Sequence, residues 1–79
     1  MAKNIRYDIA KVAQNGQIYD WEYPATFLEG VKMAKKLSLD PRWSEIYFAK
    51  ENLDENGDPD VREWTRIYKD GKLSQQMPF

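Results

Sequence analysis

The amino-acid sequence predicts a two-layer α+β fold, an antiparallel sheet of four or five strands with one helix on one face. Two segments with alternating apolar and polar residues precede one segment of helical periodicity, and two more alternating segments follow it. Asn-Gly and Asp-Gly pairs beside these segments indicate hairpin turns, which join antiparallel strands. The 79 residues suffice for a single small domain, residues 1–79, in which one helix can cover one face of the sheet.

The first two strands, residues 5–14 and 17–23, are predicted to form a hairpin across the Asn-Gly pair between them. A two-residue type I′ turn would place the apolar residues of the first strand on the face opposite Trp21. Either both faces of the sheet are partly covered, or a bulge between Ile9 and Val12 switches the alternation.

The helix is predicted from about Thr26 to Ser38. Thr26 with Glu29 three residues later forms a capping box, which marks a helix start. The Asp40-Pro41 pair ends the helix, because a residue before proline avoids the helical conformation. The side chains expected against the sheet recur at helical spacing and are Phe27, Gly30, Val31, Ala34 and Leu37.

The remaining strands are predicted at residues 44–51 and 60–70, and residues 72–75 could add a short fifth strand after an Asp-Gly turn. The order is therefore β-β-α-β-β, with or without that last strand. Within residues 60–70, alternation places one set of side chains on one face: Val61, Thr65 and Ile67. The other set, on the opposite face, is Arg62, Trp64, Arg66 and Tyr68.

Composition excludes several kinds of chemistry. The chain contains no cysteine and no histidine, which rules out Ser-His-Asp and Cys-His catalysis and a conventional zinc site. Its four glycines lack the spacing of a nucleotide-binding motif, and no pair of carboxylates suggests a glycosidase. We therefore expect a protein that is not an enzyme and that holds no cofactor.

Charge and hydropathy give expectations about location. Twelve basic residues stand against thirteen acidic ones, so the overall charge does not favour nucleic acid or an anionic membrane. The first residues lack the apolar run of a secretory signal, and no apolar stretch approaches the ~18 residues of a membrane span. These features predict a cytoplasmic protein without a membrane partner.

Residues 54–65, DENGDPDVREWT, begin like a calcium-binding loop. Such a loop needs glycine at its sixth position and glutamate at its twelfth, where this chain has Pro59 and Thr65. We therefore interpret the segment as a polar turn between strands and expect no metal site. Its carboxylates still form a local negative field that a partner could contact: Asp54, Glu55, Asp58 and Asp60.

The helix carries Lys32, Lys35 and Lys36 at spacings typical of one side of a helix, with Arg42 just beyond it. These lysines could contact a phosphate backbone or an acidic protein surface. Alternatively, they form the solvated side of a surface helix.

The interleaved aromatic and arginine residues of the strand at 60–70 are the most suggestive group. On an exposed sheet face, Trp64 and Tyr68 could stack bases while Arg62 and Arg66 contact phosphates. The same residue types dominate protein interfaces. The alternative is that Trp64 packs against the Trp21 face as core, with the arginine stems over the rings.

From these features we predict a non-enzymatic protein-interaction module with an unidentified protein partner. In size, aromatic content, acidic loop and lack of Cys and His, the chain resembles small phage and mobile-element proteins that bind and block a host protein. That resemblance implies an inhibitor or accessory protein. The alternative function is single-stranded nucleic-acid binding through the aromatic and arginine face.

Overall fold

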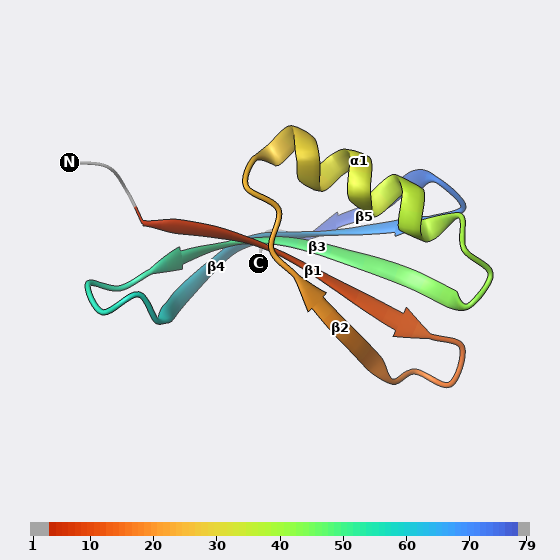
Figure 1. The fold of residues 1–79 in the computed structure, drawn as a ribbon, viewed down its shortest axis with the longest axis horizontal. Coiled ribbons are helices and arrows are strands. Elements are labelled where there is room, and N and C mark those ends of the chain that lie inside the picture. Colours follow the sequence, from red (N-terminus) through yellow and green to blue (C-terminus); the bar gives the residue numbers. More distant parts are fainter. Residues whose placement is uncertain (1–3, 78–79) are drawn as a thin grey trace.

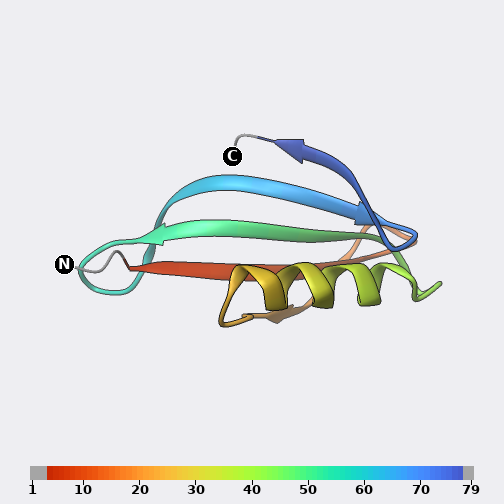
Figure 2. The same ribbon diagram turned by 90° about the horizontal axis from the view of Figure 1, so that it is seen from above.

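A computed structural model describes residues 4–77, apart from the side chains of residues 20 and 21. Its elements in chain order are β1 (Ile5–Ala13), β2 (Ile18–Glu22), α1 (Phe27–Ser38), β3 (Trp43–Leu53), β4 (Pro59–Lys69) and β5 (Lys72–Met77). The strands form one antiparallel sheet in the order β2-β1-β3-β4-β5, and α1 lies on one side of it (Figures 1 and 2). The predicted α+β fold is confirmed, and the fifth strand is present.

The turn of the first hairpin differs from the predicted two-residue type I′ turn. The Gly16 amide donates to the Ala13 carbonyl at 2.9 Å, and the Ala13 amide donates to the Gln17 carbonyl at 2.8 Å. Gly16 has a φ of 88°, whereas Asn15 keeps a negative φ. This is a three-residue loop in which glycine supplies the left-handed residue after a type I turn. A type I′ turn occurs instead between β4 and β5, where Asp70 and Gly71 both have positive φ.

The pairing of β1 with β2 also contains a bulge. Ile9 pairs with Glu22, but Lys11 pairs with Tyr19, so one residue of β1 faces two residues of β2. The extra residue lies in β2, although the sequence suggested the bulge in the first strand. A bulge switches which side chains share a face. The interpretation that required a bulge is therefore confirmed, while the expectation for the Trp21 side chain lies outside the described residues.

Local hydrogen bonds fix the start of α1 as predicted. The Thr26 Oγ1 accepts the Glu29 amide at 3.2 Å, and the Glu29 Oε2 accepts the Ala25 amide at 3.2 Å. This is a capping box whose glutamate reaches one residue further back than usual. These bonds satisfy backbone donors that the first turn of a helix leaves without partners.

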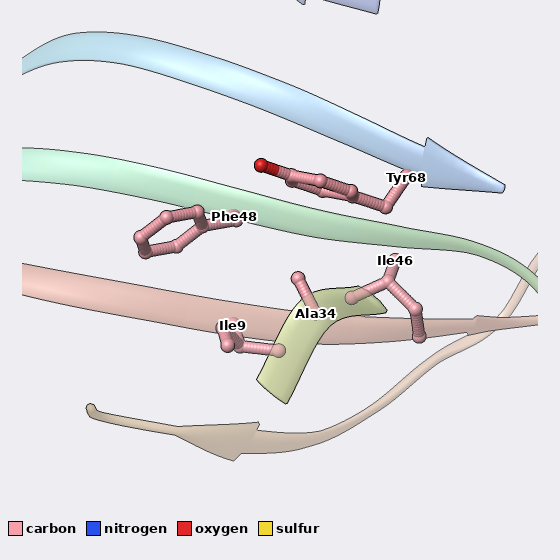
Figure 3. Packing of buried hydrophobic residues seen from close by; sticks show 5 residues of the cluster. All are labelled: Ile9, Ala34, Ile46, Phe48 and Tyr68. Carbon is pink, nitrogen blue, oxygen red and sulfur yellow. The ribbon is translucent and has the colours of Figure 1, made fainter. Parts of the chain in front are cut away.

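The core lies between α1 and the sheet. Figure 3 shows Ala34 of the helix pointing at side chains of β1, β3 and β4, and these five buried residues are Ile9, Ala34, Ile46, Phe48 and Tyr68. Half-buried Phe27, Val31 and Leu37 pack around them, which confirms the predicted inner face of the helix. Gly30 completes that face, because a Cβ at this position would overlap the ring of Phe48.

Candidate functional site

The predicted aromatic and arginine surface on β4 is not an open surface, and that expectation is wrong. The helix covers this face of the sheet, and Tyr68 is only 1% exposed. The half-buried Trp64 ring lies 5.2 Å from the ring of Phe48 and 5.8 Å from that of Phe27, measured between centroids. Trp64 therefore packs against the core through residues of β3 and α1, whereas the predicted contact with the Trp21 face lies outside the described residues.

The two arginines of this group lie on opposite faces of the sheet. Between Trp64 and Arg62 the pairing of β4 with β3 shifts by one residue, because Glu63 is an extra residue in β4. Arg62 consequently pairs with Glu51 at 3.6 Å on the face away from the helix. Arg66 stays on the helix side, where its guanidinium lies 4.9 Å from the Phe27 centroid and 5.5 Å from the Trp64 centroid, a cation–π arrangement.

The acidic segment between β3 and β4 is a tight turn, as predicted. The Asp54 Oδ1 accepts the amides of Asn56 and Asp58 at 2.9 and 3.0 Å, and Gly57 takes a positive φ of 84°. One carboxylate oxygen of Asp54 is thus used inside the turn. Among the residues that the structure describes, no group of three or more acidic side chains is placed to hold a metal ion. The candidate residues Glu55, Asp58 and Asp60 are exposed.

The turn lies far from the lysines of the helix. In Figures 1 and 2 the β3–β4 turn and the C-terminal end of α1 lie toward opposite ends of the long axis of the molecule. The acidic turn and the lysines therefore do not form one binding surface.

An ion network that the sequence did not reveal lies on the sheet face away from the helix. Arg6 contacts Asp8 at 2.9 Å and Glu51 at 3.0 Å, and both carboxylates are buried, with 3% and 8% of the residue exposed. The Arg6 guanidinium also lies 4.8 Å from the centroid of the Tyr23 ring. No local pattern could have found this network, because Arg6 and Glu51 are 45 residues apart in the chain.

The edges of the sheet are poorly suited to binding an added strand. Each edge strand, β2 and β5, carries a shift in register, and so does the first half of β4, which extends beyond β5. Bulges twist an edge and interrupt its row of hydrogen-bonding groups, which protects against pairing with another chain. A binding surface for a partner is therefore better sought on the helix than at the edges of the sheet.

The three helix lysines are exposed, as the sequence suggested. Within the described part of the chain, no ion pair engages Lys32, Lys35 or Lys36. Arg42 does not extend this group, because it binds Asp40 at 2.7 Å. The hydrogen bonds from Arg42 hold the pKa of the Asp40 carboxyl below its usual value.

Two of these lysines line a groove of about 530 Å³, a size typical of ligand sites. One wall is the connection from β2 to α1, which rises from the sheet to the helix in Figure 1, and the other wall is α1 itself. The residues that line it are Tyr23, Pro24, Ala25, Glu29, Lys32, Met33 and Lys36. Sequence reasoning found the lysines but missed the groove, because the predicted strand at residues 17–23 included Tyr23, whereas β2 ends at Glu22 and the connection to α1 begins there.

Comparison with models of protein families, with curated proteins and with solved structures finds no match to this chain. No helix in the described residues is both long and apolar enough to cross a membrane.

Proposed function

We propose that this protein is a non-enzymatic interaction module, of the inhibitor or accessory type, which binds an acidic surface of a protein partner through α1. The observation that carries the proposal is the groove in which the exposed Lys32 and Lys36 stand beside the apolar residues Pro24, Ala25 and Met33. Protein interfaces combine an apolar, often aromatic, centre with a polar rim. No internal carboxylate satisfies these ammonium groups within residues 4–77, so their charge is available to a partner.

A protein partner fits this surface better than a single-stranded nucleic acid. Non-specific binding of single strands uses a charged groove together with aromatic rings on which successive bases stack. Trp64 and Tyr68, which the sequence offered for stacking, pack beneath the helix. The one aromatic residue that lines the groove, Tyr23, holds its ring against Arg6, and the formal charge of −1 gives little general attraction to phosphates.

A charge-reversal experiment tests the proposal. The chain and the double variant Lys32→Glu/Lys36→Glu are immobilised, and proteins retained from an extract of the source cells are compared. The matched control is Lys69→Glu/Lys72→Glu, which makes the same change in charge at exposed residues of the β4–β5 hairpin. We expect a partner that the wild-type chain and the hairpin variant retain and that the helix variant loses.

Two results would overturn the proposal. Equal retention by the helix variant would mean that the groove lysines do not bind the partner. Loss of the partner after nuclease treatment of the extract would mean that nucleic acid mediates the contact. Circular dichroism of each variant separates a lost contact from a lost fold.

A further inference from the structure

The chain contains two Asn-Gly pairs, and both lie at the same position of the same kind of turn. In each loop the glycine amide donates to the carbonyl three residues earlier, at 2.9 Å for Gly16 and at 3.0 Å for Gly57. Both glycines take a positive φ, 88° and 84° respectively. Each loop is therefore a type I turn followed by a left-handed glycine. Since the backbones match, a difference in reactivity between Asn15 and Asn56 comes from their surroundings.

The contacts of the two asparagine side chains differ. Asn15 Oδ1 accepts the Gln17 amide at 3.0 Å, and Asn15 Nδ2 donates to Gln17 Oε1 at 3.4 Å. At the equivalent place in the second loop, the Asp58 amide donates to Asp54 Oδ1 instead, at 3.0 Å. No hydrogen bond from another described residue reaches the carboxamide of Asn56, which is exposed. Asp54 thus accepts the bond that would otherwise hold the asparagine side chain.

An unbound carboxamide before glycine is open to attack by the backbone. The Gly57 nitrogen first gives its proton to hydroxide and then attacks the Asn56 Cγ. The N–Cγ bond forms, the Cγ–Nδ2 bond breaks, and ammonia leaves with a proton taken from water. Water then adds to either carbonyl of the cyclic imide, which gives aspartate at one carbonyl and isoaspartate at the other. The space beside Gly57 is open, because a Cβ there would meet no atom of a non-adjacent residue within 4 Å.

We propose that Asn56 is a deamidation site of the folded protein and that Asn15, in the equivalent turn, is protected by its hydrogen bonds. The reaction adds a carboxylate to the acidic turn. Isoaspartate also lengthens the main chain of the loop, which displaces the two amides that Asp54 Oδ1 accepts. An aged chain therefore carries a more acidic and less ordered turn between β3 and β4. This chemistry does not depend on the partner that α1 binds.

The acidic residues of the turn act against the reaction. Exposed Glu55 and Asp58 place negative charge near the Gly57 nitrogen and so raise the free energy of its deprotonated form. Salt screens exposed charges, and at an ionic strength of ~1 M the Debye length is only ~3 Å. Rates measured at that ionic strength therefore report the side-chain contacts rather than the charges.

Mass spectrometry of the incubated chain tests the proposal. The full chain is kept folded at mildly alkaline pH and at this ionic strength, and samples are digested with trypsin. Asn15 then lies in a peptide of residues 12–32 and Asn56 in one of residues 51–62. Deamidation replaces an amide nitrogen by oxygen, and fragment ions separate Asn56 from Asn52 in the second peptide. A sample that has not been incubated measures the deamidation that digestion itself causes.

We expect Asn56 to react about fivefold faster than Asn15, because Asn15 must first lose a hydrogen bond of ordinary net strength. Urea that unfolds the chain supplies the first control, since both side chains then lose their folded contacts and the two rates should become nearly equal. The variant Gln17→Pro supplies the second, because proline lacks the amide that Asn15 Oδ1 accepts. It should raise the rate at Asn15 toward that of Asn56 and leave the rate at Asn56 unchanged.

Three results would overturn the proposal. Equal rates in the folded chain, or a faster reaction at Asn15, would mean that the unbound carboxamide does not expose Asn56 to attack. A difference that persisted in urea would come from neighbouring residues in the sequence rather than from the turn. A slow Asn15 in Gln17→Pro, with Asn56 at its wild-type rate, would mean that the Gln17 amide does not protect Asn15. A variant that failed to fold would shift both rates to their urea values, and the wild-type comparison would then decide alone.

Discussion

Gly30 offers a sharp test of how α1 packs on the sheet, because two physical effects of adding one methyl group oppose each other. Alanine is a better helix former than glycine, by ~1 kcal/mol at an interior helical position. On that ground alone, Gly30→Ala should stabilise the protein. The structure reverses the sign, because the new Cβ would overlap two atoms of the Phe48 ring and crowd a third.

The ring cannot easily move away. Phe48 is fully buried, and the rings of Tyr7, Phe27 and Trp64 surround it at centroid distances of 5.2 to 5.8 Å. Inserting a methyl group into such packing costs ~1–3 kcal/mol, and overlap with several ring atoms places the cost near the upper end. After subtraction of the propensity gain, we expect a net loss of ~2 kcal/mol in the free energy of unfolding.

Thermal unfolding followed by circular dichroism measures this loss. For a domain of this size, ~2 kcal/mol corresponds to a fall in Tm of roughly 8–16 °C. The double variant Gly30→Ala/Phe48→Leu should show favourable coupling, because the smaller side chain leaves room for the methyl group. An unchanged or higher Tm for Gly30→Ala would refute the close packing of α1 on β3.

Three further predictions follow from the same packing and from the acidic turn. Val31→Asp should lower the free energy of unfolding by ~2 kcal/mol or more, because it buries a carboxylate against the core, whereas Lys35→Asp on the exposed side should change it by less than ~0.5 kcal/mol. If thermal melts ranked the two variants the other way, the inferred orientation of the helix would be wrong. Trp64→Ala should cost about 3 kcal/mol, the low end for a core aromatic, because the side chain is half-buried among three rings; an unchanged urea midpoint would place it on the surface instead. Titration calorimetry should detect no tight calcium binding by residues 54–65, because Asp54 Oδ1 already accepts two backbone amides; micromolar affinity lost in Asp54→Ala would contradict the turn.

The sequence by itself determined the features that depend on neighbouring residues. Thr26 and Glu29 marked the start of the helix because a capping box is made by side chains and amides within one turn of the chain. The Asn56-Gly57 pair marked the turn between β3 and β4, because glycine tolerates the positive φ that the loop requires and this preference also depends on neighbouring residues alone. The absence of cysteine and histidine excluded whole classes of chemistry without any fold.

Only the tertiary structure decided which side chains share a surface. Period-two alternation placed Arg62 with Trp64, but one extra residue in β4 moved Arg62 to the opposite face, and no local signal in the sequence marks such a bulge. Packing against the helix then buried Tyr68, which alternation alone could not assign to core or solvent. The groove arises in the same way, because the connection from β2 and the lysines of α1 line one hollow only after the helix has packed on the sheet. Alternation reports the period of a strand, whereas the choice of covered face depends on contacts between segments far apart in the chain.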